Sequence, residues 1–257
     1  MVPVSVIIPF FNDSKGILRA LASIRNQTKV PNEVIVVDDS SKKKELIELN
    51  KIIKIFKKKM NIRLIKNKKN LGPASSRNLG WKEAKNTFIA FLDSDDSWHF
   101  KKIEIQYNFM KKSRVDISCH KSTTNYSGII HDAQDTLKYY EVKKWKMFLG
   151  NQFTTPSVML KKKIKIRFEE NKYYTEDYLL WLTLMLNNYK IFLITNTLVY
   201  IHKPLLGSGG LSKNPILMRL GEHDTLSTLY KKKLISEFFY LILIILSNIK
   251  KIIRKII

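Results

Sequence analysis

The chain has 257 residues, of which 46 are Lys or Arg and 22 are Asp or Glu, so its formal net charge is +24. With 44% hydrophobic residues and only 9 Gly and 7 Pro it can bury a sizeable core, which excludes disordered, collagen-like and low-complexity proteins. The length predicts one large domain, alone or with an appendage. The positive charge suits a negatively charged partner such as nucleic acid, anionic lipid or an anionic substrate, although most surface lysines are simply solvated.

The cysteine content and the first residues both bear on location. The single cysteine, Cys119, excludes an intramolecular disulfide and a zinc site built from several cysteines, so a reducing cytoplasm is expected. The segment MVPVSVIIPFFND is apolar but lacks the basic start of a signal peptide. We therefore expect it to form a buried first strand.

Over the first 95 residues, short apolar runs alternate with amphipathic stretches. The apolar runs predict strands at Val4–Pro9, Glu33–Val37, Ile62–Ile65 and Thr87–Leu92. Apolar residues at helical spacing predict helices at Lys15–Gln27, Lys42–Lys59 and Pro73–Ala84. This βαβαβαβ order, with nearly continuous apolar strands, predicts an α/β fold whose doubly wound, mostly parallel sheet is covered by helices on both faces.

The middle of the chain is less regular. The patterns there predict a helix at His99–Lys112, a strand at Val115–Cys119, a hairpin near Thr124–Ile130, a helix with an acidic first turn at Glu176–Asn187, and strands at Lys190–Ile194 and Leu198–His202. The next loop, Lys203–Asn214, contains three glycines, and we expect its residues 205–212 to close as a lid over a bound substrate.

The last segment, residues 213–257, differs from the rest in composition. Its apolar run Phe238–Leu246 lies between Lys231–Lys233 and the basic residues Lys250, Lys251, Arg254 and Lys255. A membrane-spanning helix needs about 20 apolar residues, so this run is too short to span a bilayer. We expect an amphipathic, apolar helical tail that lies on an anionic membrane surface. The alternative is a helix packed on the core or on a second subunit, which would make the protein a homo-oligomer.

Candidate chemistry lies where the predicted strands end, because ligands of open parallel sheets bind beyond the carboxyl ends of the strands. The second strand is followed by Asp39, whose carboxylate can accept a ring N–H of a nucleobase, and the fourth by Asp93, Asp95 and Asp96. Three carboxylates so close together repel one another unless a divalent cation with oxygen ligands binds them, which predicts a Mn²⁺ or Mg²⁺ site. The alternative is a solvated loop in which Asp95 or Asp96 caps the next helix.

Five segments carry a family resemblance over residues 4–182: VSVIIPFFND, VIVVDDSS, NLGPASSRNLGW, FLDSDDSW and TEDYLLWL. In this order and spacing they resemble the family 2 glycosyltransferases, which have the GT-A fold. The resemblance implies an inverting, metal-dependent transferase of a hexosyl or N-acetylhexosaminyl group from a nucleotide-sugar. Residues 1–212 would form the catalytic domain, with 1–96 binding the nucleotide and 97–212 the acceptor.

The resemblance also implies residue roles. Asp39 would contact the base, commonly uracil, and Arg77 would lie near the nucleotide. Asp93 and Asp95 match the DxD motif, with Asp95 the better metal ligand. The remaining implied roles are Asp177 as catalytic base with Glu176 beside it, Asp96 on the donor sugar, His202 as a further metal ligand, and Pro9, Phe11 and Ser94 in the donor site. The sequence departs from the family at Ser40, where the family commonly has Gly.

The sequence thus predicts a UDP-sugar-dependent glycosyltransferase that builds a surface polysaccharide or glycolipid at the cytoplasmic face of a membrane, its acceptor being a glycan or a lipid-linked glycan. A nucleotidyltransferase is an alternative, but it needs a basic signature near the first strand, and Pro9–Asp13 offers none. A nucleic-acid-binding protein that uses the lysine-rich segment 42–69 is the other alternative. Phe56 is the only aromatic residue in that segment that could stack on a base, so we expect no nucleic-acid partner.

Overall fold

The computed structural model describes residues 1–124, 137–203 and 214–256, with side chains to residue 249. The hairpin expected near Thr124–Ile130 and the lid expected over residues 205–212 therefore lie almost entirely outside the described residues.

The N-terminal part of the chain has the βαβαβαβ order predicted from the sequence. Its elements are β1 (Val2–Phe10), α1 (Ser14–Arg25), β2 (Pro31–Asp38), α2 (Lys43–Phe56), β3 (Ile62–Lys66), α3 (Gly72–Glu83) and β4 (Phe88–Phe91).

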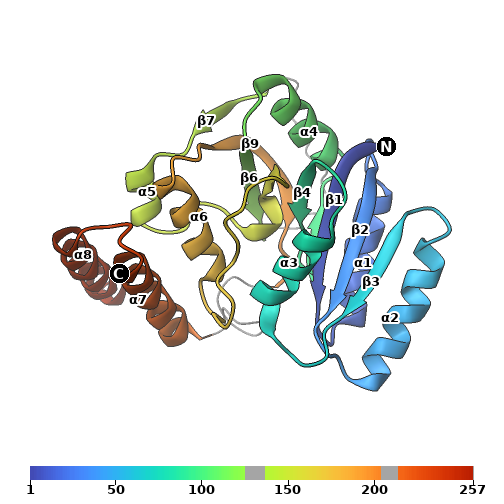
Figure 1. Ribbon diagram of the computed structural model, residues 1–257, viewed down its shortest axis with the longest axis horizontal. Coiled ribbons are helices and arrows are strands. Elements are labelled where there is room, and N and C mark those ends of the chain that lie inside the picture. The colour runs from blue at the N-terminus through green and yellow to red at the C-terminus, as the bar shows by residue number, and fades with distance from the viewer. Residues whose placement is uncertain (125–136, 204–213, 257) are drawn as a thin grey trace.

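The second part has strands of very different lengths and more varied connections (Figure 1). Its elements are β5 (Ser97–Trp98), α4 (Lys102–Ser113), β6 (Ile117–Thr123), β7 (Tyr139–Glu141), α5 (Lys144–Phe148), a 3₁₀ turn η1 (Thr155–Ser157), β8 (Met159–Lys161), α6 (Glu176–Leu186), β9 (Ile191–Tyr200), α7 (Pro215–Lys231) and α8 (Glu237–Ile256).

The strands of both parts form one sheet in the order β3-β2-β1-β4-β8-β6-β9-β5, with β7 added beside β9. The pairs among β3, β2, β1 and β4 are parallel, as is the pair of β6 with β9. Strands β8, β5 and β7 pair antiparallel with their neighbours. The α/β sheet is therefore parallel in its N-terminal half and mixed beyond β4.

One prediction of separate strands is wrong. The segments Lys190–Ile194 and Leu198–His202 belong to the single strand β9. Its register against β6 shifts between His120 and Lys121, which lets Thr195 and Asn196 bulge without ending the strand. His202 lies beyond the end of β9.

Alternating residues of β1 build the cores on the two faces of the sheet. Val6 and Ile8 pack with residues of α1, α2 and α4, whereas Ile7 packs on the other face with Trp81 of α3. Helix α3 approaches β1 closely at Gly80, where an added Cβ would lie 2.5 Å from a methyl group of Ile7. This alternation gives the two helix-covered faces that the sequence predicts.

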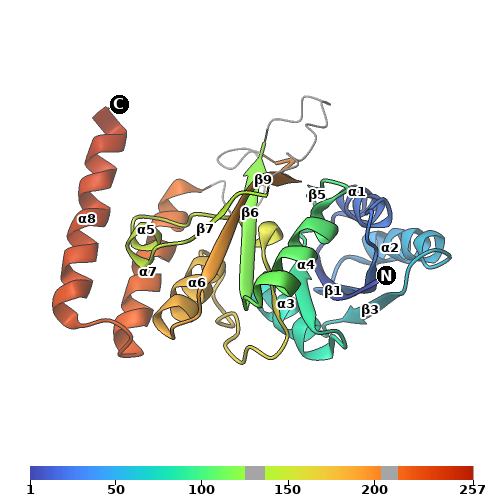
Figure 2. The same ribbon diagram turned by 90° about the horizontal axis from the view of Figure 1, so that it is seen from above.

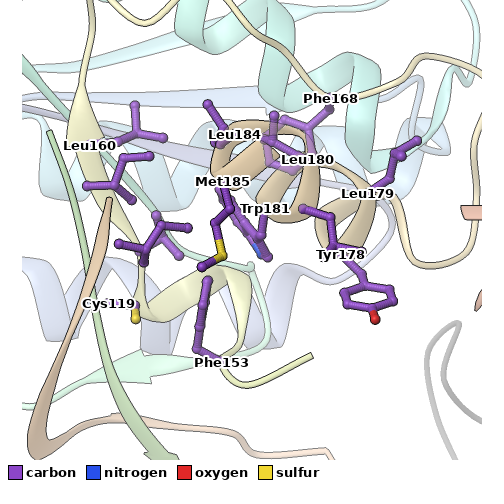
Figure 3. Packing of buried hydrophobic residues seen from close by; sticks show 14 of the residues in the cluster. Cys119, Phe153, Leu160, Phe168, Tyr178, Leu179, Leu180, Trp181, Leu184 and Met185 are labelled. Carbon is purple, nitrogen blue, oxygen red and sulfur yellow. The ribbon is translucent and has the colours of Figure 1, made fainter. Parts of the chain in front are cut away.

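Helix α6 is buried on nearly all sides, and Trp181 lies at its centre (Figure 3). The ring of Trp181 is fully buried, with its centroid 5.7 Å from that of Phe153 and 5.9 Å from that of Phe168. Packing of this kind fixes the helix in place. The N-terminal end of α6, which carries Glu176 and Asp177, is held rigidly as a result.

The C-terminal helices α7 and α8 form an antiparallel pair at the end of the molecule opposite α2 (Figure 2). Helix α7 packs against α6, and α8 packs against α7 through the stacked rings of Tyr230 and Tyr240, 5.2 Å apart. Among the described residues, no helix combines the length and the apolar character needed to cross a bilayer.

Candidate active site

A cavity of about 740 Å³ opens beyond the carboxyl ends of β1, β2 and β4. This volume is in the range of small-molecule sites. Ten of the predicted site residues line the cavity, and His202 does not: Pro9, Phe11, Asp39, Arg77, Asp93, Ser94, Asp95, Asp96, Glu176 and Asp177. The fold thus brings together, in one cavity, residues from both halves of the chain.

Asp39 lies at the end of β2 and holds the start of α3. Its Oδ1 accepts hydrogen bonds from Asn67 Nδ2 at 2.7 Å and from the backbone N of Leu71 at 2.9 Å. Its Oδ2 accepts one from the backbone N of Gly72 at 2.8 Å. The carboxylate is therefore already bonded within the chain, so contact with a base would add to these bonds or replace one of them.

Arg77 links the two sides of the cavity. Its guanidinium donates to Asp93 Oδ1 at 2.7 Å and to Glu176 Oε1 at 2.8 Å, and its side chain is 6% exposed. Burial by itself lowers the pKa of Arg77, but the charges of Asp93 and Glu176 outweigh burial and raise that pKa above its ordinary value. Arg77 is therefore a fixed cation between the turn after β4 and the start of α6.

The segment after β4 that contains Asp93, Asp95 and Asp96, here called the acidic turn, has cationic side chains beside it. Lys203 Nζ lies 2.8 Å from Asp95 Oδ2, and Arg19 donates to the backbone O of Asp95. Burial, together with the charges of Asp93 and Asp95, raises the pKa of Asp96 to about 8. The direction of this pKa shift agrees with the repulsion expected from the sequence, and cationic side chains of the protein offset part of it.

His202 lies beside this turn and not in the cavity wall. Its Nε2 is 2.7 Å from Ser97 Oγ, and its backbone N donates to Asp96 Oδ1 at 3.3 Å. The described contacts of His202 therefore anchor the chain after β9 to the acidic turn. Its role as a metal ligand stays a prediction.

Asp177 lines the cavity from the first turn of α6, and two side-chain donors from residues 151–155 hold its carboxylate. Asn151 Nδ2 and Thr155 Oγ1 each lie 3.1 Å from Asp177 Oδ2. Burial raises the pKa of Asp177 above its ordinary value, against the opposing effects of Arg77 and of these hydrogen bonds. Burial likewise raises the pKa of Glu176 to about 7, with the charge of Arg77 opposing it. A carboxylate with a raised pKa at a cavity wall is suited to accept a proton.

Sequence reasoning missed several cavity residues. Lys203 and Asn151 come from loops, Thr155 comes from the 3₁₀ turn η1, and Met218 comes from α7. Periodicity reveals residues on regular elements, whereas loop residues reach a site through tertiary folding. The one usable signal was that Lys203 directly follows the predicted site residue His202.

The residues of the acidic turn fit a divalent metal in the way expected of Mg²⁺ or Mn²⁺. Asp93 and Asp95 line the cavity with hard carboxylate oxygens, and their side chains are 29% and 24% exposed. Within the described part of the chain, no three His, Cys, Asp or Glu side chains are arranged as a complete metal cage. One or two carboxylates completed by phosphate oxygens of a substrate are the usual Mg²⁺ arrangement, so the donor set is suitable.

The chain is similar to several known proteins. An uncharacterized glycosyltransferase of Rickettsia bellii is 36% identical over 196 residues, which cover 72% of this chain but only about a quarter (26%) of that protein. A protein of Escherichia coli named UDP-Glc:alpha-D-GlcNAc-diphosphoundecaprenol beta-1,3-glucosyltransferase is 29% identical over 252 residues, 96% of this chain and 94% of that one. Staphylococcus aureus TarP, a poly(ribitol-phosphate) beta-N-acetylglucosaminyltransferase, is 32% identical over 209 residues, 74% of this chain and 60% of TarP.

The fold is shared with solved structures as well. The crystal structure of residues 1–349 of S. aureus TarS in complex with UDP-GlcNAc superposes with a TM-score of 0.69 over 88% of this chain and 66% of that one, at 23% identity. The mixed α/β sheet is therefore the GT-A fold predicted from the sequence. Residues 5–179 match the family model for glycosyl transferase family 2, and the chain belongs to that family.

Proposed function

We propose that the chain is an inverting glycosyltransferase that moves a hexosyl or N-acetylhexosaminyl group from a UDP-sugar to a hydroxyl of a glycan or lipid-linked acceptor in surface polysaccharide synthesis. The single observation that carries the proposal is the cavity that joins Asp39, Arg77 and the acidic turn to Asp177. The side of the cavity with Asp39, Arg77 and the acidic turn suits a nucleoside diphosphate. The other side carries Asp177, whose position suits a general base.

The similar proteins support the substrate classes. The name of the E. coli relative specifies a UDP-Glc donor and an acceptor linked to diphosphoundecaprenol, and TarS was solved with UDP-GlcNAc. An acceptor linked to diphosphoundecaprenol is anchored in a membrane by its lipid. We accordingly place the enzyme in the cytoplasm, peripheral to the inner face of the membrane.

On the donor side, the residues of the chain bind and orient the nucleotide-sugar. The fixed charge of Arg77 holds Asp93 in place, and Lys203 and Arg19 supply positive charge beside the acidic turn, which favours an anionic diphosphate. Asp93 and Asp95 would hold Mn²⁺ or Mg²⁺, which when bound neutralises charge that develops on the departing diphosphate.

On the acceptor side, Asp177 accepts the proton of the acceptor hydroxyl while the hydroxyl oxygen attacks the anomeric carbon. The bond to the diphosphate oxygen breaks on the opposite side, so the configuration inverts and no protein nucleophile is needed. The raised pKa of Asp177 makes it a stronger base than an exposed aspartate. Asn151 and Thr155 keep its carboxylate directed into the cavity.

The first test is a panel of UDP-, GDP-, CMP- and dTDP-sugars, assayed for binding and for nucleotide release with Mn²⁺, Mg²⁺ or EDTA. We expect metal-dependent use of a UDP-sugar by the wild type and by Asp116→Ala, a control whose carboxylate lies outside the cavity in a surface pair with Lys161. Asp95→Ala should lose this activity. Binding of no donor under any metal would refute the proposal, and an NMR spectrum showing retained anomeric configuration would refute inversion.

A further inference from the structure

One face of α8, here called the outer face, is apolar and exposed. It consists of Phe238, Leu241, Ile245 and Ile249, which are 74%, 52%, 59% and 45% exposed. The spacing of three or four residues places these side chains on one side of the helix. A contiguous apolar stripe of this kind, in contrast to scattered surface residues, marks an interaction site.

The opposite face of α8 is already used for packing. Leu243 is buried, Phe239 contacts Phe148 with ring centroids 5.0 Å apart, and Ser247 lies 3.2 Å from His223 of α7. The outer face is thus apolar surface beyond what the fold of the monomer buries. Figures 1 and 2 both show α8 as the outermost element at its end of the molecule.

Basic residues flank the outer face at both ends. The end of α7 and the turn after it carry the exposed Lys231, Lys232 and Lys233, and the sequence after Ile249 contains Lys250, Lys251, Arg254 and Lys255. Glu237 is the only acidic residue from 231 to 257. An apolar stripe between two basic clusters complements the surface of an anionic bilayer, where each basic residue adds about 1 kcal/mol of attraction.

We propose that the outer face of α8 docks on an anionic membrane surface with the helix lying in the plane of the bilayer. A second copy of the chain fits this face less well. In an antiparallel pair of α8 helices the basic turn of one copy would meet the basic end of the other, and in a parallel pair like ends would meet.

The docking face is joined to the active-site cavity through α7. Met218 of α7 lines the cavity, and on the same helix Ile216 and Leu220 are 62% and 55% exposed. Thr225 of α7 hydrogen-bonds Thr175, the residue before the first turn of α6, with their Oγ1 atoms 2.9 Å apart. If the proposed function holds, docking places the cavity beside the bilayer from which a lipid-linked acceptor projects.

Co-sedimentation of the full chain with vesicles tests the proposal. We expect binding to vesicles of phosphatidylglycerol and phosphatidylcholine, weaker binding to phosphatidylcholine alone, and release by salt. Ile245→Glu should weaken binding at least about tenfold, because it removes an inserted apolar side chain and adds a repelled charge. The matched control is Ile55→Glu on α2, which is equally exposed at 61% and lies in the other lysine-rich part of the surface.

Circular dichroism checks that each variant is folded, and Phe238→Ser provides a second test of the same face. Equal binding by wild type and Ile245→Glu, or loss of binding in Ile55→Glu alone, would overturn the proposal. The proposal would also be overturned if the wild type bound no vesicles and formed a dimer in the analytical ultracentrifuge that the Ile245→Glu substitution dissociates. Because no nucleotide is present, failure here leaves the donor panel unaffected, and failure of the donor panel leaves docking standing.

Discussion

Residues 1–96, which we propose bind the donor and which are here called the donor half, differ from the part that follows in how completely their buried polar side chains are hydrogen-bonded. Among the described residues of the donor half, the one buried side-chain atom without a hydrogen-bond partner is Arg77 Nε. The later part has several such atoms, among them Lys102 Nζ, Gln106 Oε1, Ser118 Oγ and His120 Nε2. In the donor half, almost every described buried side-chain polar atom therefore has a hydrogen-bond partner.

This difference indicates how rigidly each part holds its site residues. In the donor half, carboxylates such as Asp39 are fixed by backbone amides, which suits a rigid site for one nucleotide. In the later part, Asp177 is held by the side chains of Asn151, which lies in a loop, and Thr155, which lies in the short 3₁₀ turn η1. Polar groups that the protein leaves unbonded are commonly satisfied by internal water. The variants below disturb one part or the link between them.

The largest effect is expected for Asp177→Asn. Loss of the base should lower kcat by about 10²–10⁴-fold and leave the KM for the donor unchanged. Asp95→Ala should instead act on donor binding. Because burial raises the pKa of Asp177, the fold disfavours its ionised form, so the neutral asparagine should not lower the melting temperature. Steady-state kinetics and thermal unfolding of both variants check these outcomes, and equal loss of donor affinity would contradict the division into two halves.

Arg77→Met breaks the link between the halves. It leaves Asp93 and the buried Glu176 without their cation, so the free energy of unfolding should fall by about 3–5 kcal/mol. The control is Arg63→Met, which loses contacts to Glu33 and Glu83 but is 32% exposed; about 1–2 kcal/mol is expected there. Urea denaturation measures the free energy of unfolding of both variants. Equal losses would show that the buried ion pairs of Arg77 contribute no more than the partly exposed ion pairs of Arg63.

Lys102→Met should stabilise the later part. Lys102 is fully buried, and its Nζ lies 3.8 Å from the ring centroid of Trp98 without a hydrogen-bond partner among the described residues. Removing this polar atom should raise the free energy of unfolding by about 1–3 kcal/mol.

The same variant has a predictable pH dependence. Burial lowers the pKa of Lys102 well below its ordinary value, so the unfolded chain takes up a proton that the native state resists. The wild type therefore loses stability as pH falls below that ordinary value, and the gain from methionine should be larger in mildly acidic than in mildly alkaline buffer. Lys112→Met, an exposed position on the same helix, should change stability by less than about 0.5 kcal/mol. A destabilised Lys102→Met would indicate that internal water binds the amine well.

Thr155→Val tests the support of the base. The hydroxyl of Thr155 lowers the pKa of Asp177, so its loss should raise that pKa further and move the acid limb of kcat/KM to higher pH by about one unit. Ser157→Ala is the control, because its hydroxyl donates to the backbone O of Thr154 in the same turn and does not contact Asp177. An unchanged pH profile would show that Thr155 does not act on the base.

The two parts also differ in how well the sequence predicts them. Helical and strand periodicity predicts the elements through β4, because each apolar run there is one complete strand or helix face. The two-residue strand β5 is too short to have a pattern, and Thr195 and Asn196 interrupt the apolar run of β9 although the strand continues by bulging.

The same limit applies to the site. Asp39 and the acidic turn follow predicted strands, so topology alone places them at one edge of the sheet. Asn151 and Lys203 reach the cavity from loops, and Thr155 from the three-residue turn η1, none of which has a local sequence pattern. The resemblance to the family directed attention to Asp177, which by its sequence pattern alone is an ordinary acidic residue in the first turn of a helix.

Ser40, two residues after the end of β2, is the position where the sequence departs from its family, and it gives the smallest expected effect. Its φ is 62°, in the left-handed region that glycine adopts without strain and other L-residues adopt at a cost. Ser40→Gly should therefore raise the free energy of unfolding, but by no more than about 1 kcal/mol, since glycine also gains entropy in the unfolded chain. Ser41→Gly should instead lose about 1 kcal/mol, because the Ser41 hydroxyl accepts a hydrogen bond from the backbone N of Asn12 at 3.0 Å. If both variants lost stability equally, the strain at Ser40 would be compensated locally, and the donor half would tolerate the departure from the family without cost.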